Sequence, residues 1–168
     1  MTTATAIQPF VLNRTFNAPR QLVWDVWTKA EHLSKWFGPA GAEVISAKMD
    51  LRPGGMFLYG MKTPMGVMWG KWMFKEVVAP EKLVVVTSFS DEHAGVTRHP
   101  LAPTWPMHTL SNTIFVEKGG KTEMTLSWTP YEATPEEIAT FDAGRASMTQ
   151  GWGGTMASLD AYLAKIQQ

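Results

Sequence analysis

The chain of 168 residues is 45% hydrophobic and 18% charged, which is typical of one globular domain and excludes a disordered chain. Its 15 basic residues balance its 15 acidic residues, so a nucleic-acid or anionic-membrane partner is disfavoured. The absence of cysteine excludes disulfides and cysteine-ligated zinc. With neither a signal-peptide pattern nor an apolar run of membrane-spanning length, we expect a cytoplasmic protein without membrane insertion.

The first part of the chain predicts one strand followed by two short helices. Residues 8–16 alternate apolar and polar side chains, as a strand does. Residues 20–28, RQLVWDVWT, carry one apolar helical stripe, and residues 31–37, EHLSKWF, carry a shorter one. Gly38 then provides a helix stop.

The middle of the chain predicts six further strands that are separated by turn signals such as RPGG, TPMG and KGGK. In the last of them Met124, Leu126 and Trp128 alternate with polar residues, which indicates an antiparallel sheet with one dry face. In residues 42–51 the same alternation places Ile45 on the apolar face. The six strands are predicted at 42–51, 56–62, 67–78, 83–90, 107–117 and 122–129.

The segment 91–106, DEHAGVTRHPLAPTWP, interrupts this series of strands. It contains three prolines and is long for a loop in a compact domain, and loops of this kind often carry function. Asp91, Glu92, His93 and His99 are metal-ligating residue types that lie close together in it. We favour the simpler interpretation, an ordinary polar loop without a metal.

Two helices are predicted at the C-terminus. Thr134 and Glu137 form a capping box, and Pro135 occupies the first helical position of a short helix. A second helix is predicted over residues 145–166, with large apolar residues three or four apart. The element order predicts a single α+β domain over residues 1–168, in which a curved antiparallel sheet wraps around the long helix. Residues 1–7 are expected to form a flexible tail.

Segments spread over residues 10–164 resemble those of a known family in their order and in their amino-acid sequence. They include FNAPRQLVWDVWTKAEHLSKWFGP, MDLRPGGMF, NTIFVEKGGKTEMTLSW and ATPEEIATFDAGRASMTQGWGGTMASLDAYLA. The chain resembles the SRPBCC (START-like, helix-grip) superfamily, in the branch related to the activator of heat-shock-protein-90 ATPase and CalC-like proteins. The resemblance implies about six or seven strands around a long C-terminal helix, with a deep cavity between them. Many members bind apolar small molecules, some are cyclases or dehydratases, and a few are co-chaperones.

A cavity of this kind would be lined by large apolar residues and a few polar ones. The 8 tryptophans and 11 methionines fit either an irregular core or a hollow one. Among polar residues, Asn112 shares strand parity with Leu110, Ile114 and Val116, which predicts that it points inward; for it, as for Arg14, an ordinary structural role is the alternative. The predicted lining is Trp36, Phe57, Tyr59, Met61, Trp69, Trp72, His108, Asn112, Met148, Trp152 and Met156.

The stretch TQGWGGTM in the last helix holds Gly151, Gly153 and Gly154. It has neither the lysine of a phosphate-binding loop nor a preceding strand, so nucleotide binding is disfavoured. Glycine in a helix costs about 0.5–1 kcal/mol relative to alanine. Either close packing against a neighbour or room for a ligand beside Trp152 would account for the three.

Three functions are consistent with the sequence. We favour binding of a small hydrophobic or amphipathic molecule, without a cofactor or metal, by a monomer or homodimer. A cavity enzyme of the cyclase, dehydratase or hydrolase type, acting on an aromatic or polyketide-like substrate, is the first alternative. It would need a cavity-facing ionisable group with a pKa shifted by burial. A co-chaperone-like interaction module is the second alternative.

Overall fold

The computed structural model describes residues 8–38, 41–99 and 102–168, so the tail expected at residues 1–7 lies outside the described residues. The strands are β1 Phe10–Phe16, β2 Glu43–Met49, β3 Met56–Thr63, β4 Gly66–Val78, β5 Lys82–Ser90, β6 Val96–Thr97, β7 Thr109–Lys118 and β8 Lys121–Pro130. The helices are α1 Arg20–Thr28, α2 Ala30–Trp36, α3 Pro135–Ala143 and α4 Arg145–Ile166. The element order confirms the α+β prediction, and the short strand β6 is an addition to it.

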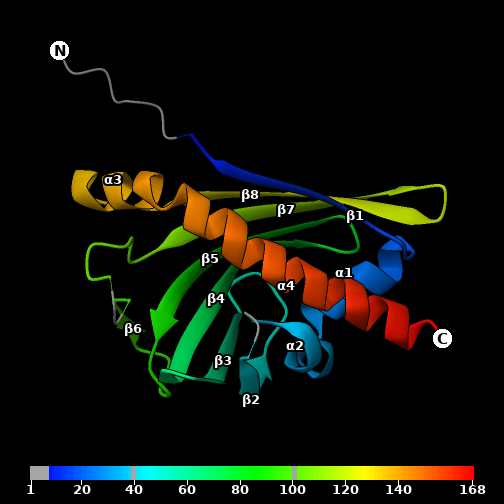
Figure 1. Cartoon of the computed structure of the whole chain (residues 1–168), viewed down its shortest axis with the longest axis horizontal. Helices are drawn as coiled ribbons and strands as arrows, with labels where there is room; N and C mark the ends of the chain where they lie inside the picture. The colour runs from blue at the N-terminus through cyan, green and yellow to red at the C-terminus, as the bar shows by residue number, and fades with distance from the viewer. Residues whose placement is uncertain (1–7, 39–40, 100–101) are drawn as a thin grey trace.

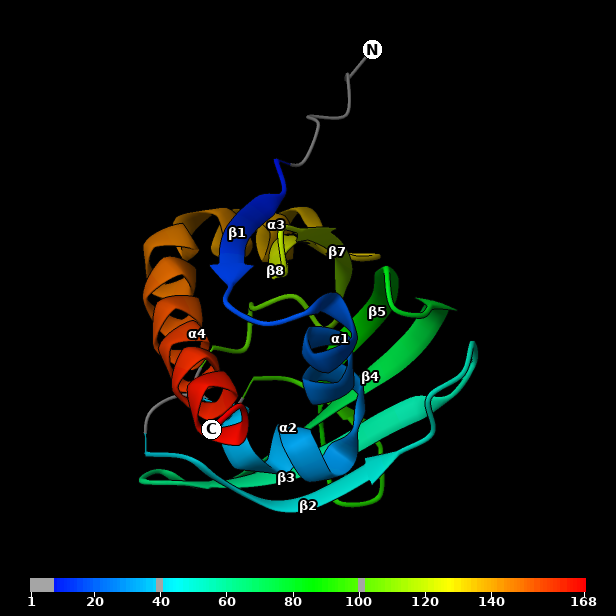
Figure 2. The same ribbon diagram turned by 90° about the vertical axis from the view of Figure 1, so that its right-hand side faces the viewer.

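The strands form one antiparallel sheet in the order β1-β8-β7-β5-β4-β3-β2, and β6 pairs with β5 beside this path. Figure 1 shows α4 running diagonally across the sheet. Figure 2 shows that the sheet curves and that α4, α1 and α2 all lie on its concave side. This arrangement is the helix-grip fold that the sequence predicted.

The main core fills the space between the concave face, the two short helices and the C-terminal half of α4. Met156, Leu159 and Leu163 of α4 are buried there against residues such as Phe57 and Phe115. A second, smaller cluster of Phe10, Phe141 and Met148 lies near the beginning of α4. Burial of these apolar side chains drives the helix onto the sheet, at about 1.5–3 kcal/mol for each large one.

The predicted inner face is wrong at one residue of β2 and for the apolar residues predicted inward on β7. In β2 the predicted Ala47 and Met49 do pack against the core. In β2 the register shifts between Val44 and Ser46, so Ile45 is the extra residue of a β-bulge and is 50% exposed instead of facing the core. In β7 the concave face carries Thr109, Thr113 and Phe115, all buried.

The opposite, convex face of β7 carries the apolar residues Ile114 and Val116, which are 41% and 43% exposed. Asn112 shares their face by the two-residue alternation of a strand, so it points away from α4. The sequence prediction assigned Leu110, Ile114 and Val116 to the inside, whereas Thr109, Thr113 and Phe115 occupy that side.

Close packing does not explain the three glycines of α4. A methyl group placed on Gly151, Gly153 or Gly154 would meet no atom within 4 Å other than its own helix and chain neighbours, and all three glycines are exposed. No close contact therefore requires glycine at these positions, and nothing of that kind offsets the helix stability that glycine loses relative to alanine.

We predict that Gly153→Ala and Gly154→Ala each stabilise the protein by about 0.5–1 kcal/mol, because alanine favours the helix and has room. Urea denaturation followed by circular dichroism measures the free energy of unfolding. Gly70→Ala is the opposing control, since its methyl group would lie 2.4 Å from the hydroxyl of Tyr59 and should destabilise. Loss of stability in both α4 variants would contradict this view of the helix.

Candidate functional site

A cavity of about 580 Å³ lies where the first half of α4 passes over the sheet. Its walls come from β3, β4, β5, β7 and β8, from the beginning of α4, and from the segment that joins β6 to β7. The apolar and glycine residues that line it are Phe37, Gly38, Tyr59, Met61, Met68, Trp69, Phe89, Trp105, Pro106, Trp128, Gly144, Met148, Gly151 and Trp152. The remaining lining residues are Thr63, Thr87, Ser88, His99, Thr109, Ser147 and Thr155.

One end of the cavity is walled by a cluster of indole rings. The ring of Trp128 lies 6.0 Å from that of Trp105 and 6.1 Å from that of Trp152, measured between centroids. Phe141 packs behind them, 5.5 Å from Trp128 and 5.6 Å from Trp105. Edge-to-face and tilted contacts of this kind fix large flat surfaces in place. Such surfaces suit a flat apolar ligand.

Tyr59 projects into the cavity from β3, where it pairs with Gly70 of β4. Its ring lies over Gly70, so closely that a methyl group there would be 2.4 Å from the hydroxyl oxygen. The phenol stacks on Phe57 at 5.2 Å. Burial raises the pKa of Tyr59 to about 12, and a hydrogen bond with the Trp72 side chain opposes this rise only in part. Tyr59 is therefore a neutral phenol at physiological pH.

Trp69 borders the cavity in a different way. It pairs with Gly60, and its ring lies 3.0 Å from where a methyl group on Gly60 would be. Neighbours along a strand point to opposite faces, so the indole of Trp69 lies on the face of the sheet opposite to Tyr59. The indole of Trp69 therefore does not form part of the concave floor of the cavity.

Most of the polar residues that line the cavity carry a hydroxyl group. The hydroxyls of Thr87 on β5 and Thr109 on β7 are hydrogen-bonded to each other across the paired strands. Thr155 of α4 donates its hydroxyl to the carbonyl of Gly151 at 3.1 Å. The Ser88 hydroxyl is buried without a hydrogen-bond partner among the described residues, and as the strand neighbour of Thr87 its side chain points to the opposite face of the sheet.

His99 is the one histidine among the described lining residues. Its ring stands edge-on to Phe89 with 4.7 Å between centroids, and its partial burial lowers its pKa. The imidazole is therefore neutral at physiological pH. Within the described ranges, no three His, Asp or Glu side chains cluster closely enough to hold a metal ion.

Of the four metal-ligating residue types in the 91–106 segment, Asp91 has a structural role in the backbone turn that follows β5. The Asp91 carboxylate accepts hydrogen bonds from the backbone amides of His93 and Gly95, which closes a tight turn. These bonds lower the pKa of Asp91. Glu92 and His93 are exposed side chains 3.4 Å apart.

Five of the eleven residues that the sequence predicted as lining border the cavity: Tyr59, Met61, Trp69, Met148 and Trp152. Phe57, Trp72, Trp36 and Met156 lie deeper and belong to the packed core. The indole of Trp36, for example, donates to the carbonyl of Val26 at 2.9 Å and joins α2 to α1. Alternation along a strand identifies the inner face, but it does not tell which inner residues pack against helices.

The two polar residues predicted on β7 do not line the cavity. The Asn112 side chain points to the convex face, where its buried carbonyl oxygen lacks a partner among the described residues. His108 precedes β7, and its backbone carbonyl accepts from the amide of Tyr131 at 2.9 Å. Thr109, the next residue along, lines the cavity instead.

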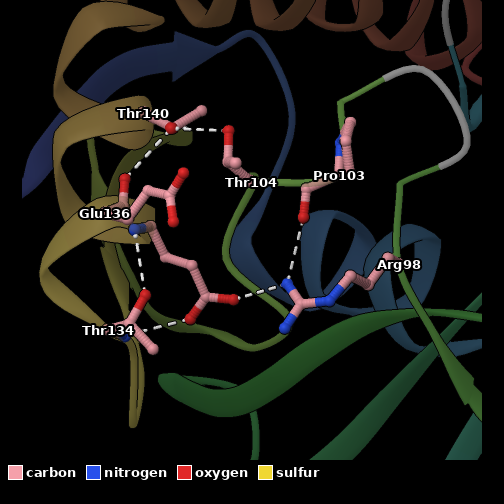
Figure 3. A network of polar contacts seen from close by, with 7 residues as sticks. Arg98, Pro103, Thr104, Thr134, Glu136 and Thr140 are labelled. Atoms are coloured by element: carbon pink, nitrogen blue, oxygen red, sulfur yellow. Dashed lines mark hydrogen bonds and ion pairs between the residues drawn. The ribbon is translucent and has the colours of Figure 1, made fainter.

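The segment that carries His99 and Trp105 is anchored to α3 by the network in Figure 3. Arg98 donates to the carboxylate of Glu137 at 2.7 Å and to the carbonyl of Pro103 at 3.1 Å. Glu137 also accepts from the backbone amide of Thr134, and Thr134 caps Glu137 in return, which confirms the predicted capping box. These hydrogen bonds, first that of Thr134 and then that of Arg98, lower the pKa of Glu137.

A second hollow of about 540 Å³ lies near the C-terminal end of α4. Its lining is small and polar apart from Leu163, and it includes Asn17, Asp160 and Gln167. Arg14 forms an ion pair with Asp160, so this arginine has a structural partner and does not face the aromatic cavity. The aromatic cavity is therefore the better candidate for an apolar ligand.

Comparison with known proteins places the chain in a family. Residues 17–164 match the family described as Activator of Hsp90 ATPase homolog 1-like protein. The chain belongs to this family. The structure contains no helix within its described ranges that is long and apolar enough to cross a membrane. No curated protein matches the chain.

Solved structures of bacterial proteins share the fold of this family member. A protein from Mycobacterium smegmatis is 25% identical, with a TM-score of 0.75 over 94% of this chain and 91% of its own. A protein from Nitrosomonas europaea is 23% identical, with a TM-score of 0.74 over 98% and 99%. A protein from Rhodobacter sphaeroides is 18% identical, with a TM-score of 0.77 over 99% of both chains. The last two support the fold alone.

We predict that Glu137→Gln destabilises the protein by about 1–2 kcal/mol, because a capping-box acceptor and an ion pair are weakened together. Glu136→Gln removes the same charge from the neighbouring exposed position and should stay within about 0.5 kcal/mol of the parent. Because the pKa of Glu137 is lowered by folding, its contribution is present above the unfolded pKa. It is lost as pH falls through the folded pKa. Urea titrations at neutral and acidic pH measure both effects, and equal losses in the two variants would contradict the assignment.

We also predict that one of the three tyrosines ionises with a pKa of about 12 and that this step is absent in Tyr59→Phe. Tyrosinate absorbance, with near-ultraviolet circular dichroism to confirm folding, follows the titration. Because folding raises the pKa of Tyr59 above its unfolded value, the protonated phenol stabilises the folded state at lower pH. This stabilisation is lost as pH rises from 10 toward 12, so the free energy of unfolding should fall over that range. Ionisation of all tyrosines near pH 10 in the folded protein would contradict the burial of Tyr59.

Proposed function

We propose that this protein binds a small hydrophobic or amphipathic molecule in the cavity between the sheet and α4. The observation that carries the proposal is the cavity itself, about 580 Å³ in volume and walled by aromatic rings and methionines. Binding sites for small molecules typically measure about 300–1,000 Å³ and are mostly apolar with a few polar groups. Burial of a ligand's apolar surface against these walls would provide the affinity.

A substitution on α4 can test occupancy of the cavity without disturbing the sheet. Gly151 lines the cavity on the same helical face as Met148 and Thr155, three residues before and four after it. Gly153 is also an exposed helical glycine with open space around it, but it does not line the cavity. The two positions therefore form a matched pair.

We expect Gly151→Leu to weaken binding of Nile red, a neutral apolar dye, at least 10-fold because the new side chain occupies part of the ligand's volume. Gly153→Leu should bind the dye as the parent does. Dye fluorescence and quenching of the cavity tryptophans measure the affinity, and circular dichroism confirms that both variants fold. Equal binding by the two variants, or no binding by the parent, would refute the proposal.

A cavity enzyme is the second candidate. Two ionisable side chains with pKa values shifted by burial, Tyr59 and His99, border the cavity, and shifted groups in a cleft are typical of general acids and bases. None of the described lining residues carries a carboxylate. Native mass spectrometry of ligand that copurifies, followed over time, would detect turnover as a change in ligand mass.

The co-chaperone role, the cytoplasmic location and the oligomeric state stay predictions. The family description names an activator of Hsp90 ATPase, but a shared fold does not transfer a partner. Failure to retain a purified Hsp90-type chaperone in a binding assay would count against that role.

A further inference from the structure

The charge of the cavity wall restricts the ligands that can enter. None of the described lining residues is Asp, Glu, Lys or Arg. A carboxylate or ammonium group bound against these walls would lose part of its hydration without gaining a charged partner, and that loss is unfavourable.

The hydroxyls of the wall have protons left to donate. In the Thr87–Thr109 pair one hydroxyl donates to the other, so the accepting hydroxyl keeps its own proton for a third group. An indole N–H can only donate, so in the contact between Trp72 and Tyr59 the phenol oxygen accepts. The phenol proton of Tyr59 is therefore also free of that bond.

These donors lie near one another on the concave face. The Tyr59 hydroxyl lies over Gly70 of β4, whose Cα is a diagonal neighbour of Thr87 on β5. Diagonal neighbours on adjacent strands are about 7–8 Å apart. Trp72 pairs directly with Thr87, so its indole lies between the two groups of donors.

We infer that the cavity selects an uncharged, largely aromatic molecule whose acceptor oxygen, such as a ketone carbonyl, is bound by Tyr59 or by the Thr87–Thr109 hydroxyl pair. Carboxylates and amines of the same size are excluded. This inference rests on the proposed function and narrows it from hydrophobic or amphipathic molecules in general to neutral acceptors.

Four probes that share the pyrene ring system separate the effect of charge from that of a neutral acceptor oxygen. They are pyrene, 1-acetylpyrene, 1-pyrenecarboxylate and 1-pyrenemethylammonium. Energy transfer from the cavity tryptophans to the pyrene group measures each dissociation constant at neutral pH. We expect 1-acetylpyrene to bind about 3- to 10-fold tighter than pyrene, the worth of one hydrogen bond. The carboxylate and the ammonium should bind at least 10-fold weaker than pyrene.

Variants assign the donor. Tyr59→Phe or Thr109→Val should abolish the preference for 1-acetylpyrene over pyrene. Tyr131→Phe, at a tyrosine that does not line the cavity, is the control and should keep the preference.

Three outcomes would overturn the inference. Carboxylate or ammonium binding as tight as that of 1-acetylpyrene would refute the exclusion of charge and leave the binding function intact. A preference unchanged in both Tyr59→Phe and Thr109→Val would refute the donors named. Failure of all four probes, together with Nile red, would refute the binding function and the inference together.

Discussion

The packing of a straight helix against a curved sheet is the constraint on which the rest of the structure depends. The 22 residues of α4 span about 33 Å, and the sheet beneath them is curved. Met156, Leu159 and Leu163 bring the C-terminal half of the helix into full contact with the main core, and Arg14 holds Asp160 at the edge. A rigid helix fixed in this way cannot also follow the sheet at its other end. The space that remains under its first half is the cavity.

A separate set of interactions closes that space from the side. The segment between β6 and β7 supplies Trp105 and Pro106 to the wall, and it is held by Arg98 on the Glu137 carboxylate. Glu137 also caps α3, the helix that leads directly into α4. One carboxylate therefore links the start of the helical region to the wall of the cavity, and charge-assisted hydrogen bonds of this kind are among the stronger ones in proteins.

Much of the fold could be predicted from local patterns. The helix of residues 20–28, the capping box at Thr134 and the alternation of the last strand are signals that depend on near neighbours, and all three are confirmed. The face of β7 could not be predicted, because its outward residues Ile114 and Val116 are as apolar as core residues. The bulge that turns Ile45 outward depends on pairing with β3 and leaves no trace in the spacing of β2.

The cavity lining could be predicted only in part, for a related reason. Alternation placed Tyr59 and Met61 on the correct face, but it placed Phe57 there equally well, and depth under the helices separates Phe57 from the other two. His99 and Trp105 come from an aperiodic segment. Its length was a signal of function, although no spacing rule could show which of its side chains reach the cavity.

The positions of the three glycines match the division of α4 into a packed C-terminal half and a first half that passes over the cavity. Together they cost about 1.5–3 kcal/mol of helical stability relative to alanine, and the structure provides no close contact that needs them. They fall in the half of α4 that passes over the cavity, whereas the packed half from Met156 onward contains none. Helices in proteins are held mainly by the burial of an apolar face. Intrinsic propensity and tertiary packing are thus both weaker over the cavity, so the local stability of α4 decreases from its packed C-terminal half toward the wall that a ligand would contact.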